Sequence, residues 1–221
     1  MLRIAKGNMY PWVDVLWNPI TGKCPHECVY CYMNMFPQRE LRLNEKFLKD
    51  NLGESKTIFV GSGTDMFADK VPREWIERVL EKCRMYAGNT YLFQTKNPAK
   101  FWYFDHLFPR TTIFGVTLET NRDITDVSLA PSPKSRASNM HEWFMKRKMI
   151  SIEPILDFDL EPFVEMIKGI KPEFVSIGAD SKGHNLAEPS KEKVEALIAE
   201  LRFTEVKIKS NLRRLGVEVR P

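Results

Sequence analysis

Three cysteines lie close together near the amino terminus, at Cys24, Cys28 and Cys31, in a segment of the form C-x3-C-x2-C. This spacing lets three thiolates converge on one face of an iron–sulfur cluster, the kind of group that cysteine thiolates ligate. No fourth cysteine is nearby, so one iron of a four-iron cluster would lack a protein ligand. An open iron can bind a substrate or a cofactor, whereas electron-transfer clusters usually use four cysteines. The spacing therefore favours a catalytic cluster.

Two other interpretations of these cysteines stay open. His26 lies between Cys24 and Cys28 and would complete a four-ligand zinc site, but it is only two residues from each of them. That is cramped for zinc ligands. Alternatively, the thiols are buried together by coincidence. The remaining cysteine, Cys83, falls on the apolar face of a predicted helix, and we interpret it as a small buried hydrophobic residue outside the cluster.

A glycine-containing segment follows the predicted strand at residues 57–60. Gly61 and Gly63 flank Ser62 and would let the backbone approach a ligand closely; a simple tight turn is the alternative. Asp65, two residues further on, can accept a hydrogen bond from an ammonium group, or it only caps a helix. Thr64 completes this candidate binding segment.

Charged residues follow three later strands. Lys96 can meet the carboxylate of a cofactor or an anionic substrate, although an isolated lysine is usually solvated. Glu119 is placed where a carboxylate can bind two ribose hydroxyls, and a surface glutamate is the alternative. Glu153 points either into the mouth of a barrel or into an internal salt bridge. We therefore expect Lys96 and Glu119 to belong to a ligand site.

The elements that position these residues alternate between short β-rich runs and stretches of helical period. Residues 73–86 and 191–201 each place apolar side chains on one helical face. Alternating strands and crossover helices predict an α/β fold with a mainly parallel sheet, and the chain length suits a partial (β/α)6-type TIM barrel. In such a fold the carboxyl ends of the strands carry the active site. The predicted strands are 13–17, 57–60, 91–94, 112–116, 149–152, 174–177 and 206–208.

The chain has 221 residues, and we expect one domain over residues 1–221 with a cluster loop at 18–32. A second, longer loop at 121–137 lacks helical period, and Ser138 is the predicted cap of the helix after it. This loop is either a lid or substrate-binding element, or a surface insertion. We find no linker that would divide the chain.

Composition and charge are those of an ordinary globular protein, with 43% hydrophobic and 28% charged residues. The net charge of +4 is far below that of a dedicated nucleic-acid binder. Without a signal peptide or an apolar run long enough for a membrane span, we expect a cytoplasmic protein with reduced thiols and no membrane partner. The basic segment at 207–214 either contacts phosphates or is a solvated strand and helix start.

The cysteine motif resembles that of radical S-adenosylmethionine (SAM) enzymes, with the aromatic Tyr30 directly before the last cysteine. The segment 61–65 is similar to the glycine motif whose backbone meets the methionine amino group of SAM, and Glu119 resembles the position that contacts the ribose. The segments 17–22 and 95–98 are similar to a phage-associated, uncharacterised radical SAM family. Thr64-Asp65 and Thr95-Lys96 also resemble spore photoproduct lyases, which repair DNA.

The resemblance implies a [4Fe-4S] cluster held by Cys24, Cys28 and Cys31, with SAM bound to the open iron. One electron from an external donor would cleave SAM and give a 5′-deoxyadenosyl radical, which abstracts hydrogen from a substrate. Tyr30, the segment 61–65, Lys96 and Glu119 are the cofactor-binding residues that it implies. The substrate is not readable, and a nucleic acid is one candidate. The alternative is a non-catalytic iron–sulfur or zinc module associated with nucleic acid.

Overall fold

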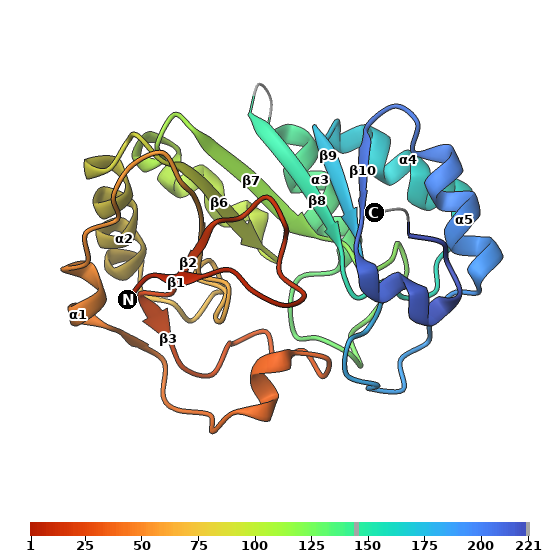
Figure 1. The fold of residues 1–221 in the computed structure, drawn as a ribbon, viewed down its shortest axis with the longest axis horizontal. Coiled ribbons are helices and arrows are strands. Elements are labelled where there is room, and N and C mark those ends of the chain that lie inside the picture. Colours follow the sequence, from red (N-terminus) through yellow and green to blue (C-terminus); the bar gives the residue numbers. More distant parts are fainter. Residues whose placement is uncertain (144–145, 220–221) are drawn as a thin grey trace.

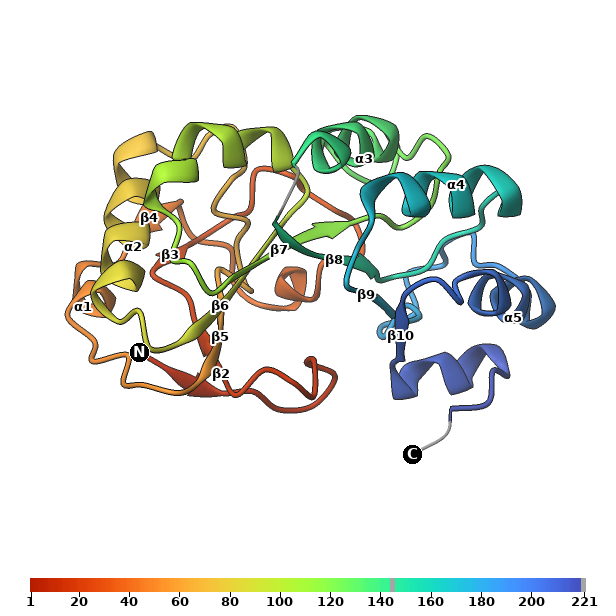
Figure 2. The same ribbon diagram turned by 90° about the horizontal axis from the view of Figure 1, so that it is seen from above.

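The centre of the protein is a curved sheet of eight strands, seen in a computed structural model that describes residues 1–143 and 146–219 (Figures 1 and 2). The strand order is β1-β2-β5-β6-β7-β8-β9-β10. All neighbours from β2 to β10 pair in parallel, and β1 pairs antiparallel with β2. The strands are β1 (Arg3–Ile4), β2 (Val15–Trp17), β5 (Thr57–Val60), β6 (Thr90–Thr95), β7 (Thr112–Thr117), β8 (Arg147–Ile152), β9 (Phe174–Ile177) and β10 (Glu205–Ile208).

Helices follow the strands and cover the convex outer side of the sheet (Figure 2). In the described part of the chain, no helix combines the length and the apolar character that a membrane crossing requires. The helices are α2 (Arg73–Met85), η2 (Pro98–Leu107), α3 (Pro133–Glu142), α4 (Leu160–Ile170), α5 (Lys191–Glu200) and η3 (Ser210–Leu215).

The core lies between the sheet and these helices. Every residue of β7 and of β9 is buried, as expected for parallel strands covered by helices. On α2 the apolar residues recur at helical spacing, and Ile76, Val79, Leu80 and Cys83 are all at most 1% exposed. Burying an aliphatic side chain of this size stabilises the fold by about 1.5–3 kcal/mol. The predicted α/β fold, a partial barrel with a mainly parallel sheet, is confirmed.

The segment between β2 and β5 leaves the sheet and carries the three clustered cysteines. Two short strands, β3 (Ile20–Thr21) and β4 (Arg42–Leu43), pair antiparallel and close its base. Between and after them lie two short helices, η1 (Tyr32–Met35) and α1 (Glu45–Leu48). The cysteines are therefore held on a loop with a fixed base at one edge of the sheet.

The long loop predicted at 121–137 is shorter than expected, because helix α3 begins at Pro133. Ser132 caps this helix: its hydroxyl accepts a hydrogen bond from the backbone N–H of Ser135 at 3.3 Å. Ser138, the predicted cap, is an exposed residue inside the helix. Proline suits the first position of a helix, since it needs no N–H donor there and its φ is already helical. The predicted loop at 121–137 includes Pro133, so the sequence-based prediction missed this helix start.

Candidate cofactor site

The clustered cysteines and the polar strand ends line one cavity of about 460 Å³. The cavity lies at the carboxyl ends of the parallel strands, as the fold predicts. All the predicted site residues line it except Glu119. Those that do are Cys24, Cys28, Tyr30, Cys31, Gly61, Ser62, Gly63, Thr64, Asp65 and Lys96.

The three cysteines fit a cluster that leaves one iron open. None of them forms a disulfide; Cys28 is buried, and Cys24 and Cys31 are partly exposed toward the cavity. The loop turns tightly around them, since the backbone N–H of Cys31 donates to the carbonyl of Cys28 at 3.1 Å. Three thiols around one cavity, with room beside them, match the donor set of a three-cysteine iron–sulfur site.

Without a metal, the thiols of Cys24 and Cys31 stay protonated. Burial, and then the nearby Asp65 carboxylate, raise the pKa of Cys24 to about 12. Burial also raises the pKa of Cys31. A thiolate at either position therefore needs positive charge beside it, which metal ions supply while displacing the thiol protons.

A single zinc ion does not fit. His26, the fourth ligand of the zinc interpretation, directs its Nε2 to a carboxylate oxygen of Asp65 at 2.9 Å. Over residues 1–143 and 146–219, no three His, Cys, Asp or Glu side chains are arranged to hold one metal ion. The ligands of a mononuclear site must converge on one point, whereas the cysteines of a cluster bind different irons.

Asn18 holds the glycine-containing segment against the cluster loop. Its Oδ1 accepts from the backbone N–H of Gly63 at 3.2 Å, and its Nδ2 donates to the Ser62 hydroxyl at 3.1 Å. Gly61 has a φ of +79°, and a Cβ there would lie 3.2 Å from the carbonyl oxygen of Thr64. Only glycine takes this backbone shape without strain, so the segment forms the predicted tight turn and also lines the cavity.

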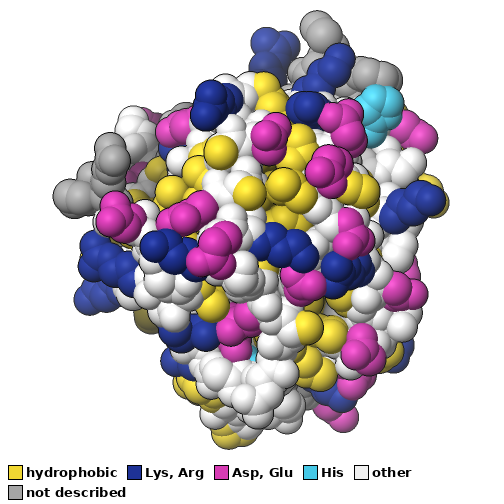
Figure 3. Space-filling model, turned by 90° about the vertical axis from the view of Figure 1, so that its right-hand side faces the viewer, with side chains coloured by type: hydrophobic (Ala, Val, Ile, Leu, Met, Phe, Trp, Pro, Cys, Tyr) yellow, Lys and Arg dark blue, Asp and Glu magenta, His cyan; other side chains and the backbone are white. Residues whose placement is uncertain are grey.

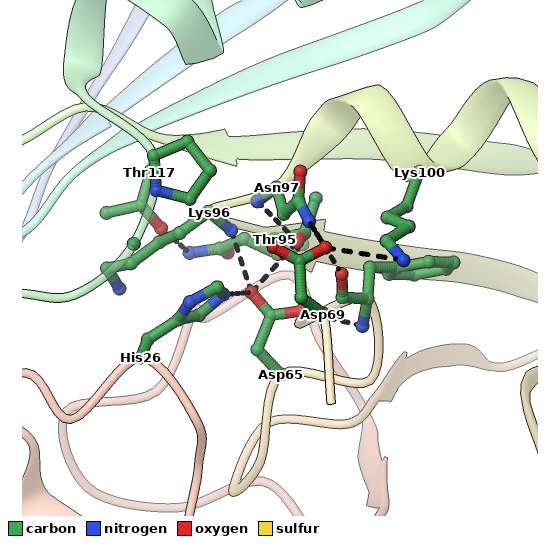
Figure 4. A network of polar contacts seen from close by, with 12 residues as sticks. His26, Asp65, Asp69, Thr95, Lys96, Asn97, Lys100 and Thr117 are labelled. Carbon is green, nitrogen blue, oxygen red and sulfur yellow. Dashed lines mark hydrogen bonds and ion pairs between the residues drawn. The ribbon is translucent and has the colours of Figure 1, made fainter. Parts of the chain in front are cut away.

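Asp65 is the hub of a buried polar network (Figure 4). Besides His26, its carboxylate accepts from the Thr95 hydroxyl at 2.8 Å and from the backbone N–H of Lys96 at 2.8 Å. Its other oxygen accepts from the backbone N–H of Phe67 at 2.9 Å. Asp65 thus ties the glycine segment to the end of β6 and to the cluster loop, and its acceptor positions are already used by the protein.

This network gives a pH-dependent contribution to stability. Burial by itself would raise the pKa of Asp65. The electrostatic interaction with His26 and the hydrogen bonds that the Asp65 carboxylate accepts hold this pKa below its ordinary value. A lowered folded pKa stabilises the fold above the unfolded pKa of about 3.9, and this is lost as the pH falls through the folded value. We expect Asp65→Asn to lower the free energy of unfolding by roughly 1.5–3 kcal/mol at neutral pH, measured by urea denaturation.

The difference between wild type and Asp65→Asn should shrink as the pH falls below about 4, the unfolded pKa, toward the lower pKa of the folded protein. Asp69→Asn is the matched control: Asp69 belongs to the neighbouring contacts drawn in Figure 4, but its side chain is 76% exposed. An equal loss in both variants would contradict the role of Asp65 as a hub.

Glu119 is fully buried and does not line the cavity, so the surface alternative is wrong, and its contact with a ribose stays a prediction. Its carboxylate accepts from the Tyr30 hydroxyl on one side and from the Arg136 guanidinium at 2.7 Å on the other. The Lys96 ammonium is 3.9 Å away and lies over the Tyr30 ring. Burial alone would raise the pKa of Glu119, but the Arg136 and Lys96 cations lower it.

Arg136 anchors this group from the start of α3. It is fully buried, and besides Glu119 it donates to the carbonyls of Pro131 at 2.6 Å and Thr117 at 2.9 Å. A series of contacts therefore connects the end of the long loop, through Arg136 and Glu119, to Tyr30 in the cysteine motif. Sequence reasoning missed Arg136, because it fell inside the segment assigned to a loop; the Ser132-Pro133 helix start would have revealed it.

The long loop lies beside the cluster loop. The backbone N–H of Val29 donates to the carbonyl of Val127 at 3.0 Å, and that of Leu129 donates to the carbonyl of His26 at 2.8 Å. These contacts are not those of a free surface insertion, and a role of the loop as a lid or substrate-binding element stays a prediction. The loop therefore supports the cysteine segment in this structure.

The far wall of the cavity carries Glu153, whose carboxylate pairs with the Lys209 ammonium at 2.8 Å. Glu153 therefore lines the cavity and also forms an internal salt bridge, so the two alternatives predicted for it are both present. Tyr10, also missed from sequence, lines this side and donates to the Ser151 hydroxyl at 2.8 Å.

The basic segment 207–214 is largely neutralised by acidic partners. Lys207 pairs with Glu205, and Arg214 pairs with Glu188. On the face that carries α5, basic and acidic side chains are interspersed (Figure 3). This arrangement favours a solvated salt-bridged surface there over a phosphate-binding patch.

Solved structures of spore photoproduct lyase share this fold. One point variant superposes with a TM-score of 0.65 and 13% identity, covering 91% of this chain and 78% of that one. A second variant gives 0.63 and 12%, covering 93% and 78%. A variant with bound AdoMet and dinucleoside spore photoproduct gives 0.53 and 13%, covering 88% of this chain and 62% of the other.

A comparison with curated protein sequences finds no match. A family model described as "Protein of unknown function (DUF5131)" matches residues 8–197. That span contains the cysteine motif, the glycine segment and the strands β2 to β9. The chain therefore belongs to the DUF5131 family.

Proposed function

We propose that the protein is a radical SAM enzyme that binds one [4Fe-4S] cluster through Cys24, Cys28 and Cys31. One observation carries the proposal: these cysteines line the same strand-end cavity as the glycine segment 61–65 and Lys96. The shared fold with spore photoproduct lyase supports it. When bound, the cluster and SAM supply a 5′-deoxyadenosyl radical by one-electron cleavage of SAM.

The residues of the chain would bind and orient the cofactor. The tight turn at Gly61 lines the cavity beside the cysteines. Lys96 keeps its positive charge: burial would lower its pKa, but a thiolate at Cys28 and the Glu119 carboxylate raise it above the ordinary value. It is therefore suited to the SAM carboxylate. Glu119 acts indirectly, by fixing Tyr30 in the cysteine motif.

The substrate, the electron donor and the location in the cell belong to the same proposal. A nucleic acid is the candidate substrate, since one similar structure contains a dinucleoside spore photoproduct. An external one-electron donor would serve the cluster in a reducing cytoplasm, where free thiols persist. The association with phages stays a prediction.

The alternative of a non-catalytic module is less well supported. A structural metal site is closed by its four protein ligands. Here the cysteines adjoin a cavity of about 460 Å³ lined by polar groups from many strands, which is the form of a ligand site.

Anaerobic reconstitution with iron and sulfide, followed by reduction in the presence of SAM, tests the proposal. We expect cluster formation and release of 5′-deoxyadenosine and methionine, quantified by chromatography. A fully loaded cluster that never cleaves SAM would contradict the enzymatic function, and four-coordinate zinc in the purified protein would favour the module.

A further inference from the structure

A serine of the long loop contacts one of the proposed cluster ligands. The Ser128 Oγ lies 3.1 Å from the Cys28 Sγ, and both side chains are buried. The two residues are 100 positions apart in sequence, so only the fold brings them together. Ser128 does not line the cavity, and it is a buried polar residue that does not belong to the apolar core. Neither the cavity nor core packing therefore explains the contact.

The direction of this hydrogen bond follows from the other contacts of Ser128. Its oxygen already accepts from the backbone N–H of Ala130 at 3.2 Å, so its single proton is free to be donated. The alternative acceptor, the carbonyl of His26, is farther away at 3.4 Å and already accepts from Leu129. A cysteine thiolate can only accept. Once Cys28 is a thiolate, the Ser128 hydroxyl donates to its sulfur.

The surrounding backbone fixes Ser128 in this position. Its own N–H donates to the carbonyl of Ile124 at 3.0 Å, closing a turn within the loop. On either side of it, Val127 and Leu129 bond to the cluster loop through Val29 and His26. The hydroxyl is thus held on the segment that supports the cysteines, and its aim does not depend on a mobile side chain.

We propose that Ser128 is a positioning residue that raises the reduction potential of the cluster through an O–H···S bond to Cys28. The inference rests on the proposed cluster. Hydrogen bonds to cluster sulfurs are a main determinant of potential. Reduction adds one electron and one negative charge, and a donor beside a ligand sulfur stabilises the more negative state. The long loop therefore makes the electron easier to supply.

A redox titration of the reconstituted protein, followed by electron paramagnetic resonance, tests this. In Ser128→Ala we expect the ratio of reduced to oxidised cluster at fixed poise to fall about tenfold, which is 59 mV toward negative potential for one electron. Ser128→Thr keeps the hydroxyl and should retain the wild-type potential. Ser128→Val has the same shape as Ser128→Thr without the donor, and should shift as Ser128→Ala does.

Ser138→Ala is the matched control, because Ser138 is exposed on α3 and should leave the potential unchanged. Equal potentials in wild type, Ser128→Ala and Ser128→Val, all with full clusters, would overturn the role of Ser128 while leaving the proposed enzyme intact. A wild-type protein that assembles no cluster would overturn both. SAM cleavage is measured separately, so its failure does not affect the measured potential.

Discussion

Replacing Cys24, Cys28 or Cys31 by alanine is expected to abolish cluster binding and the cleavage of SAM. The three thiols line one cavity, and no fourth cysteine lies in the loop to replace a lost ligand. Mutation of a residue that only hydrogen-bonds a metal ligand already costs about 10- to 100-fold in metal affinity or activity. Loss of a ligand itself should cost at least that much. Iron content after reconstitution and the yield of 5′-deoxyadenosine measure the effect.

Cys83→Ala is the control for this experiment. Cys83 is fully buried on α2 among apolar residues, and burial raises its pKa well above the ordinary value, so its thiol is inert. This variant should keep its iron and its activity. Full iron loading in Cys28→Ala, or an equal loss in Cys83→Ala, would show that the motif does not hold the cluster.

Replacing Arg136 by methionine is expected to cause a large loss of stability. The guanidinium and the Glu119 carboxylate form a fully buried ion pair, and loss of the guanidinium leaves the carboxylate with the neutral Tyr30 hydroxyl and with Lys96 at 3.9 Å. Breaking a buried pair on one side costs about 3–5 kcal/mol, because the remaining charge stays desolvated. Urea denaturation of the protein without its cluster measures the free energy of unfolding.

Arg122→Met is the matched control for Arg136→Met. Arg122 also forms ion pairs, with the carboxylates of Asp157 and Asp159, but its side chain is 42% exposed. Exposed pairs contribute little, so the loss should be much smaller. If both variants lost the same stability, burial would not explain the importance of Arg136. A double variant that also replaces Glu119 should recover part of the loss, since the buried carboxylate that lost its Arg136 partner is then absent as well.

Local patterns predicted the strands and their carboxyl ends correctly. Alternation of β-rich and helical segments depends on near neighbours in sequence, and the carboxyl ends of parallel strands must meet at one edge of the sheet. For that reason the amino-acid sequence alone is enough to place the segment 61–65 and Lys96 beside the cysteines. The strands that carry them are neighbours in the observed sheet, with Val60 opposite Phe93.

The partners of the charged residues could not be predicted in this way. Glu119 has the spacing of a ribose-binding residue, yet its carboxylate is taken up by Tyr30 and Arg136. Asp65 likewise has the position of a helix cap or an ammonium acceptor, but it bonds to His26 across 39 residues. Spacing places a side chain at a strand end, while the groups that meet it come from other loops.

By itself, the sequence determined the chemistry that is available: three thiols at ligand spacing, a glycine turn, and a parallel α/β framework that brings them to one edge. The tertiary structure decided which groups are free for a ligand and which are used by the protein. It buried Glu119 outside the cavity lining and placed Ser128 against Cys28. The physical reason is that hydrogen bonds and ion pairs act over a few ångströms in space, whatever the separation along the chain.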